Sequence, residues 1–187
     1  MRGRLIVFEG LDASGKTTII REIMKRKDDC AYSKGLGSES WLGRLVSEHP
    51  STFLFLTDMI HSQRKDILPL LREGKDVLQD RYVFSLYSYL PASKHLHNKL
   101  LLSAFEKYLL KPDLLFYVTV SDEERIVRLK KAKESVHHTN LIRNPGLMRM
   151  MDDKYCSCYE SFKGEKYLID TTDRSIDYVV QEVMSRL

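Results

Sequence analysis

Cysteine is scarce in this chain of 187 residues, which has three: Cys30, Cys156 and Cys158. An odd number without regular spacing argues against a disulfide framework and fits a reducing compartment, so we expect a cytoplasmic protein. Long hydrophobic runs are lacking too, since none approaches the ~20 residues that a membrane helix needs. The apolar stretch after Arg4 breaks at Glu9, which is too early for a secretory signal. We therefore expect no membrane partner.

Charge of one sign is not in excess either. Lysine and arginine number 30 against 26 aspartate and glutamate residues, which gives a formal net charge of +4. This mild balance suits a small polyanion, and we expect no nucleic-acid partner because no aromatic platform motif accompanies the basic residues. The Asn-Lys-x-Asp guanine reader of GTP switches is also missing, since Asn98-Lys99 is followed by two leucines. A GTP switch is therefore not predicted.

What the chain does contain is a phosphate-binding loop. Residues 10–17 read GLDASGKT and fit the pattern G-x-x-x-x-G-K-[ST], between an apolar run at 5–8 and a helical pattern. Loop amides at the start of a helix bind phosphate oxygens, Lys16 would reach the outer phosphates, and the Thr17 hydroxyl would sit on Mg²⁺. The predicted nucleotide-binding residues are Gly10, Asp12, Ala13, Ser14, Gly15, Lys16, Thr17 and Thr18.

Strand and helix patterns alternate along the chain, which predicts one α/β domain over residues 1–187 with a parallel sheet. The predicted strands are 5–9, 30–33, 77–79, 114–120 and 167–169. The predicted helices run from the loop to about 27, over 52–71, 96–108, 121–129, 147–162 and 176–187. Pro69 should kink or end the second of these helices. Ser121 and Glu124 form a capping-box pattern at the start of the fourth.

A second motif, Asp80-Arg81-Tyr82, follows a predicted strand directly. The carboxyl ends of parallel strands form the ligand crevice of such folds. A carboxylate there can hold Mg²⁺ or its waters, and the adjacent guanidinium can clamp a phosphate through paired hydrogen bonds. We therefore predict that Thr17 and Asp80 hold the metal ion and that Arg81 binds phosphate.

A basic cluster lies further along the chain. It comprises Arg125, Arg128, Lys130, Lys131, Lys133 and Arg143, at the end of a helix and in a polar loop that contains His137-His138. Phosphoryl transfer needs positive charge over the migrating group and exclusion of water, and a mobile basic lid provides both. We predict a lid at about residues 130–145; the alternative is a solvated helix face.

Taken together, these segments resemble the thymidylate kinases, a branch of the nucleoside monophosphate kinases. The resemblance spans nearly the whole length and is carried, in order, by Phe8-Glu9-Gly10-Leu11-Asp12, Leu54-Phe55, Asp80-Arg81-Tyr82, Lys111-Pro112-Asp113-Leu114 and Ile169-Asp170-Thr171-Thr172. It implies the three-layer P-loop kinase fold, with a five-stranded parallel sheet flanked by helices. It also implies ATP-dependent transfer to a nucleoside 5′-monophosphate with Mg²⁺, most simply dTMP to dTDP, and allows a homodimer through helix faces.

The resemblance also implies roles for single positions. Asp12 matches the carboxylate that touches the 3′-hydroxyl of the acceptor sugar, and Phe55 matches the ring that stacks under the acceptor base. Tyr89 falls at the spacing of a tyrosine that packs against the sugar and disfavours a 2′-hydroxyl. Arg81 matches the arginine that contacts the acceptor phosphate and bridges towards the donor, and Asp80 matches the aspartate that organises Mg²⁺.

Some family members carry a catalytic arginine inside the phosphate loop, where this chain has Ala13. The chain therefore resembles the branch that supplies this charge from the lid, for which Arg128, Lys130 and Arg143 are candidates. Together with Lys16 and Arg81, we predict Arg128 as a catalytic residue.

The acceptor site departs from the family pattern. Met59 stands where the family places an arginine for the acceptor phosphate, and Arg64 lies on a different helix face. Lys34 keeps the charge of an Arg-x-Pro-type segment whose proline is gone, and Leu86 replaces a residue that is often polar. Lys34 and Arg81 are therefore expected to hold the acceptor phosphate.

Two other functions stay open at this point. A deoxynucleoside kinase would use the same donor site with Glu9 or Asp80 as a base near the acceptor 5′-hydroxyl. A non-catalytic homologue would bind ATP without turnover, and Met59 is the feature that keeps this alternative open.

Overall fold

The structure is a computed structural model that describes residues 2–37, 40–49, 51–89, 95–132 and 136–187. Its strands are β1 (Leu5–Glu9), β2 (Cys30–Lys34), β3 (Asp76–Asp80), β4 (Leu114–Thr119) and β5 (Glu165–Asp170). Its helices are α1 (Lys16–Arg26), α2 (Trp41–Glu48), α3 (Thr52–Ser62), the π-helix η1 (Gln63–Ile67), α4 (Leu68–Arg72), α5 (Val83–Tyr89), α6 (His95–Glu106), α7 (Asp122–Lys131), α8 (Val136–Arg143), α9 (Pro145–Ser161) and α10 (Ile176–Met184).

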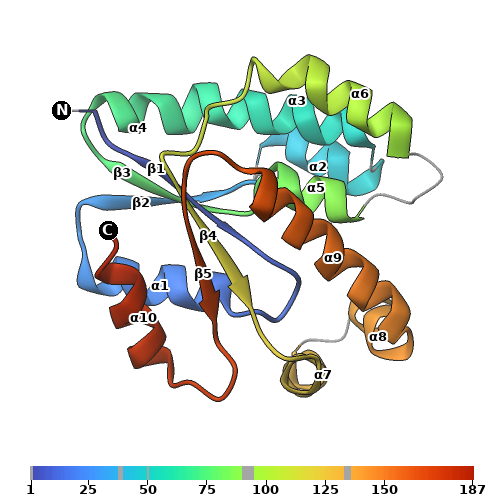
Figure 1. Cartoon of the computed structure of the whole chain (residues 1–187). Coiled ribbons are helices and arrows are strands. Elements are labelled where there is room, and N and C mark those ends of the chain that lie inside the picture. The colour runs from blue at the N-terminus through green and yellow to red at the C-terminus, as the bar shows by residue number, and fades with distance from the viewer. Residues whose placement is uncertain (1, 38–39, 50, 90–94, 133–135) are drawn as a thin grey trace.

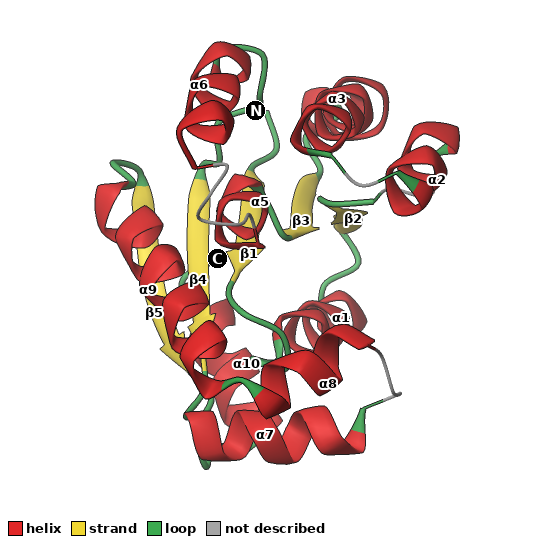
Figure 2. Cartoon of the chain, turned by 90° about the vertical axis from the view of Figure 1, so that its right-hand side faces the viewer, coloured by secondary structure: helices red, strands yellow, loops and turns green. Residues whose placement is uncertain are grey.

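The five strands form one parallel sheet in the order β2-β3-β1-β4-β5. Helices cover both faces, with α1 and α10 on one side and α3, α4, α5, α6 and α9 on the other (Figure 1). Helices α7 and α8 lie at the end of the sheet to which the phosphate loop also leads (Figure 2). The predicted three-layer α/β architecture and the five parallel strands are confirmed.

Side chains of the central strands alternate between two hydrophobic cores. Ile6 and Phe8 of β1 pack with α1 and α10, whereas Leu5 and Val7 pack with the helices of the other face. This alternation follows from the two-residue period of a strand, and continuous apolar runs result because both faces of a parallel sheet are covered. In the described part of the chain, no helix is both long and apolar enough to cross a membrane.

Three helices were not predicted as such. Helices α2 and α5 were left without assignment, and α8 was expected to be a polar loop. Helix α8 is short, and among its side chains that the structure describes only Leu141 is fully buried. A short helix with so weak an apolar stripe gives little periodic signal.

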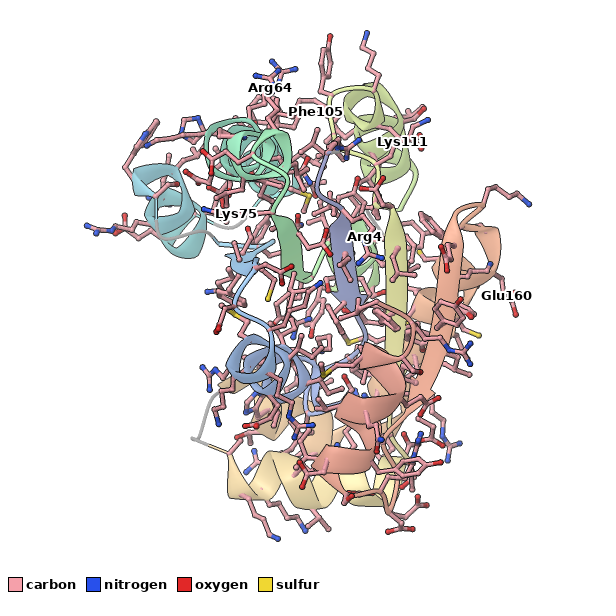
Figure 3. The ribbon with its side chains drawn as sticks, turned by 90° about the vertical axis from the view of Figure 1, so that its left-hand side faces the viewer. Arg4, Arg64, Lys75, Phe105, Lys111 and Glu160 are labelled. Carbon is pink, nitrogen blue, oxygen red and sulfur yellow. The ribbon has the colours of Figure 1, made fainter. Side chains whose placement is uncertain are left out.

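Pro69 changes the helical geometry of the turn that precedes it. The helical segment continues past Ser62, but residues 63–67 form the wider π-helix before α4 begins. A proline lacks the amide hydrogen and crowds the carbonyl four residues earlier, and a π-turn relieves this conflict without ending the segment. Arg64, within this turn, lies with its guanidinium 6.0 Å from the ring centre of Tyr108, at the end of the molecule opposite α7 (Figure 3).

Only half of the predicted capping box forms. The Ser121 hydroxyl accepts from the Glu124 amide at 3.3 Å, but the Glu124 carboxylate does not return to Ser121. It accepts instead from Arg128 and from the amide of Asp173, and the Ser121 amide donates to Thr172. Tertiary partners have therefore replaced the local bond, and they tie α7 to the loop after β5.

Gly35 permits the loop after β2 to pack on the end of β3. Its amide donates to the carbonyl oxygen of Asp80 at 2.8 Å, and a Cβ at this position would overlap the carbonyl oxygen of Arg81. A glycine is therefore needed because two backbone segments approach closely.

Gly35→Ala should lower the free energy of unfolding by about 1–3 kcal/mol, because the added methyl group forces the Arg81 backbone aside. Gly146→Ala is the matched control, since its Cβ would meet only the Asn144 side chain at 3.5 Å. Urea unfolding of both variants checks this expectation. Equal midpoints for the two variants would contradict the packing described here.

Candidate nucleotide-binding site

The phosphate loop joins β1 to α1 and takes backbone angles that most residues avoid. Gly10 and Gly15 have φ values of 142° and 100°, and Ala13 adopts the left-handed region at 62°. A Cβ on Gly10 would overlap the carbonyl oxygen of Val118 in the neighbouring segment. Both glycines are therefore required by their conformation, and Gly10 also by close packing.

Lys16 begins α1 and bends back over the loop. Its Nζ atom donates to the carbonyl oxygens of Gly10 and Leu11 at 2.7 and 2.9 Å and to the Ser14 hydroxyl at 3.2 Å. Burial, together with repulsion from Arg81, lowers the pKa of Lys16 to about 8. The ammonium group is thus held in a dry site by dipoles, where a phosphate oxygen would be a stronger partner.

Thr17 and Asp80 lie together as predicted. The Thr17 hydroxyl donates to Oδ2 of Asp80, while Oδ1 of Asp80 is buried without a hydrogen-bond partner among the described residues. A hydroxyl and a carboxylate oxygen with unused acceptor capacity suit Mg²⁺, which in proteins is held by few protein oxygens together with substrate phosphates. The residues present therefore fit a magnesium ion.

Arg81 has a strained backbone that its surroundings fix from several sides. Its φ is 75°, its amide donates to the carbonyl oxygen of Phe8 at 2.9 Å, and its carbonyl oxygen accepts from the Gln79 side chain at 3.0 Å. Such a conformation costs on the order of 1–3 kcal/mol and is typical of functional positions. Here it turns the side chain towards the phosphate loop.

The Asp12 carboxylate gathers three side chains from different elements. Arg81 forms an ion pair with Oδ1, the Tyr89 hydroxyl donates to Oδ2 at 2.8 Å, and Nε2 of His137 lies 3.0 Å from Oδ2. Burial opposes ionisation of Asp12, but His137, Arg81, Lys16 and Tyr89 outweigh it and hold its pKa well below the usual range. The predicted residues Asp12, Arg81 and Tyr89 are thus brought together, and His137 joins them from α8.

Glu9 anchors the segment that carries Arg81. Its carboxylate is fully buried and accepts from the amides of Tyr82 and Ser85 at 2.7 and 2.9 Å and from the Ser85 hydroxyl at 2.6 Å. Burial raises the pKa of Glu9 to about 7, against these hydrogen bonds and the charge of Arg81. Ser85 accepts in turn from Arg81 at 3.2 Å and from Tyr155 at 2.8 Å. Sequence reasoning did not find Ser85 or Tyr155, because their partners lie far apart in the chain.

A cavity of about 480 Å³ opens beside the loop. Most of the predicted phosphate-loop residues line it, together with Arg81 and Arg128. The loop after β5 and α10 add residues that the sequence pattern did not indicate as site residues: Thr171, Arg174, Ile176 and Val179. These residues form a second end of the cavity, where Ile176 and Val179 are apolar and Arg174 adds a guanidinium.

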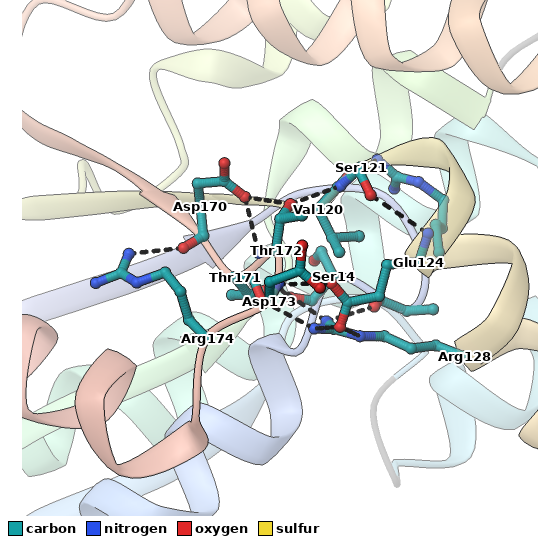
Figure 4. A network of polar contacts seen from close by, with 12 residues as sticks. Ser14, Val120, Ser121, Glu124, Arg128, Asp170, Thr171, Thr172, Asp173 and Arg174 are labelled. Atoms are coloured by element: carbon teal, nitrogen blue, oxygen red, sulfur yellow. Dashed lines mark hydrogen bonds and ion pairs between the residues drawn. The ribbon is translucent and has the colours of Figure 1, made fainter.

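Arg128 belongs to a network that links this second end to the phosphate loop (Figure 4). It donates to the carbonyl oxygen of Ala13 at 3.2 Å, to the Thr171 hydroxyl at 2.9 Å and to the Glu124 carboxylate at 2.6 Å. The Thr171 hydroxyl also reaches the carbonyl oxygen of Ser14 at 3.1 Å. Arg128 therefore lines the cavity from a fixed position.

The predicted basic lid divides into two parts. Arg125 and Arg128 point inward from α7, whereas Lys130, Lys131 and Arg143 are exposed. Lys133 lies outside the described residues. Arg125 of the basic cluster is therefore not part of an exposed basic surface, because its side chain is only 2% exposed.

The expected acceptor residues are more dispersed. Lys34 ends β2 opposite Asp80 and is exposed, and Phe55 lies half-buried on α3. In the described part of the chain, neither side chain lines the cavity or contacts the Asp12 cluster, which comprises Asp12, Arg81, Tyr89 and His137. Met59 is 1% exposed within a hydrophobic core, and Leu86 is likewise buried. Arg64, at the end of the molecule opposite α7 (Figure 3), lies over the ring of Tyr108.

Comparison with known proteins gives a consistent result. A family model described as thymidylate kinase matches residues 8–183. A probable thymidylate kinase of Methanocaldococcus jannaschii is 29% identical, with 97% of this chain and 94% of the relative covered. A probable thymidylate kinase of Archaeoglobus fulgidus is 34% identical over 68% of this chain and 69% of the relative.

Solved structures bear on the fold. The thymidylate kinase from Candida albicans superposes with a TM-score of 0.78 at 21% identity, covering 99% of this chain and 91% of that one. The thymidylate kinase from Ehrlichia chaffeensis gives 0.71 at 17% identity, covering 100% and 98%. The predicted P-loop kinase fold is confirmed.

The lowered pKa of Lys16 predicts a pH dependence of ATP binding. Lys16 should lose its proton as the pH rises through about 8, so the affinity for ATP should be about tenfold weaker at pH 9 than at pH 7. In Lys16→Arg the guanidinium stays protonated, so the affinity should not change over this range. Calorimetry in magnesium buffer measures both, and equal wild-type affinities at the two pH values would contradict the assignment.

Proposed function

This chain belongs to the thymidylate kinase family, and we propose on that basis how its residues divide the work of the reaction. The chain is a nucleotide kinase that phosphorylates dTMP to dTDP with ATP. Such transfer involves little covalent chemistry by the protein and depends on positioning and charge. One observation carries the assignment: Lys16, Thr17, Arg81 and Arg128 converge on one cavity at the carboxyl end of the sheet.

The donor site consists of the phosphate loop and the second end of the cavity. The Lys16 ammonium group leaves the carbonyl oxygens of Gly10 and Leu11 and binds oxygens of the donor phosphates. The backbone amides of the loop bind the other phosphate oxygens. Thr17 and Asp80 would hold Mg²⁺, which when bound neutralises charge on the donor phosphates. The apolar wall around Ile176 and Val179 suits the base of the donor.

The acceptor site lies around Arg81. The Arg81 guanidinium leaves the Asp12 carboxylate and binds the phosphate of dTMP through two parallel hydrogen bonds. This bidentate contact is needed because Met59 supplies no positive charge. Asp12 and Tyr89 then face the sugar, Asp12 through the 3′-hydroxyl. Lys34 adds charge from the end of β2.

Phe55 is proposed to stack under the thymine base. It lies on α3, half-buried, and packs against the core that contains Leu5 and Val7. Its role follows from the family pattern rather than from a contact with the Asp12 cluster.

Transition-state charge is balanced from two sides. Arg81 and Arg128 line the cavity from the end of β3 and from α7, and Lys16 lines it from the start of α1. Fixed donors around developing charge are worth more in a dry site than in water. These three residues are the proposed catalytic residues.

The geometry argues against Glu9 as the base for transfer to an unphosphorylated nucleoside. That reaction needs a base near the acceptor 5′-hydroxyl, for which Glu9 and Asp80 were the candidates. Both Glu9 oxygens accept hydrogen bonds from the start of α5, and Glu9 does not line the cavity. Glu9 is therefore a structural anchor.

Two further proposals concern the whole molecule. A homodimer is supported by exposed aromatic side chains on α2 and α3, where Trp41 and Phe53 are 69% and 53% exposed. A cytoplasmic location is supported by the three cysteines, which are all free.

The assay that tests this function supplies ATP, Mg²⁺ and either dTMP or thymidine. We expect dTDP from dTMP and no product from thymidine. Lys16→Met should lower kcat at least about 100-fold because it removes the only ammonium group in the loop. Lys25→Met, on the exposed face of the same helix, is the matched control and should leave kcat unchanged. Preference for thymidine, a wild-type rate in Lys16→Met, or ATP binding without dTMP-dependent ADP release would overturn the proposal.

A further inference from the structure

Arg125 is the most deeply buried arginine side chain described, and it contacts the underside of the phosphate loop. It comes from α7 and is 2% exposed. Its Nη2 atom donates to Oδ2 of Asp152 on α9 at 2.9 Å and to the carbonyl oxygen of Val120 at 3.1 Å. Its Nη1 atom donates to the carbonyl oxygen of Asp12 at 3.4 Å. One guanidinium thus joins α7, α9, the end of β4 and the loop.

Stability alone is a poor reason for this arrangement. Burying a charge pair costs desolvation that the attraction often fails to repay. Only one Asp152 oxygen pairs with Arg125, and Nε of Arg125 has no partner in the part of the chain that the structure describes. Burial raises the pKa of Asp152 to about 6 although Arg125 opposes this, so burial weakens the pair.

The contacts with the phosphate loop indicate that Arg125 orients the loop backbone. Arg125 and Arg128 lie three residues apart and share one face of α7. They hold two consecutive loop carbonyls, those of Asp12 and Ala13. In a trans peptide the carbonyl and the following amide point in opposite directions. Holding the Asp12 carbonyl towards α7 therefore turns the Ala13 amide away from it, and Ala13 lines the cavity.

We propose that Arg125 is a positioning residue for phosphoryl transfer, which sets the direction of the Asp12–Ala13 peptide while Asp152 fixes its guanidinium from α9. This rests on the proposed function, because it assigns the loop the task of binding donor phosphates. The same grip aligns the Asp12 side chain, which pairs with Arg81 and Tyr89. Arg125 does not line the cavity, so it acts through the loop rather than on the substrate.

A double substitution separates this role from a structural one. Asp152→Leu alone leaves the buried Arg125 charge unpaired and should lower Tm by roughly 10 °C. Arg125→Met alone removes the partner of the partly exposed Asp152 carboxylate and should lower Tm by less. The combination of both replaces the pair with apolar side chains and should restore Tm. Because the loop peptide stays unheld, kcat/KM should remain on the order of 100-fold below wild type, with weaker ATP binding. If activity returned together with Tm, the positioning role would be refuted.

Two further variants complete the test. Arg125→Lys keeps the charge but cannot reach Asp12, Val120 and Asp152 at once, so it should fold and still lose kcat/KM. It carries the test should the double variant fail to fold, and a wild-type kcat/KM in Arg125→Lys would overturn the proposal. Arg149→Met alters an exposed arginine of α9 and should match wild type. Absence of dTMP phosphorylation in wild type and Arg149→Met would count against the proposed function instead.

Discussion

The ion pair between Asp12 and Arg81 is the interaction on which the site depends. It joins the phosphate loop after β1 to the turn after β3, and these strands are neighbours in the parallel sheet. The pair exists because Arg81 accepts a φ of 75°, which hydrogen bonds with Phe8 and Gln79 hold and for which Gly35, lacking a Cβ, leaves room. A strained backbone held in this way places the guanidinium where two substrates would meet.

The surrounding charges follow the same logic. Lys16 is held by loop carbonyls, Thr17 by Asp80 and Arg128 by Ala13 and Thr171. Each cation or hydroxyl has a hydrogen-bond partner whose place a phosphate oxygen or a metal ion would take. The new interaction would be stronger. Such preorganisation lowers the cost of assembling charge in a dry site during the reaction. Arg125 adds to this preorganisation by holding the carbonyl oxygen of Asp12 in the loop.

The sequence predicted those parts that local patterns specify. The phosphate loop, the five strands and the Asp80-Arg81-Tyr82 turn were predicted because each has a pattern of spacing or of strand followed by polar residues. Contacts set by tertiary packing were missed. Glu124 was assigned to a local cap but reaches Asp173, and Arg125 was grouped with exposed lysines although it is buried. Helix α8 was taken for a loop because its apolar stripe is weak. Which residues carry catalysis remains a prediction.

A crystal structure with ADP and dTMP bound tests the central claim most directly. The account predicts that Arg81 leaves the Asp12 carboxylate and forms paired hydrogen bonds with the phosphate of dTMP, while Asp12 turns to the 3′-hydroxyl. It also predicts that Lys16 leaves the carbonyl oxygens of Gly10 and Leu11 for the phosphates of ADP. Arg81 still paired with Asp12, with dTMP bound elsewhere, would contradict the account.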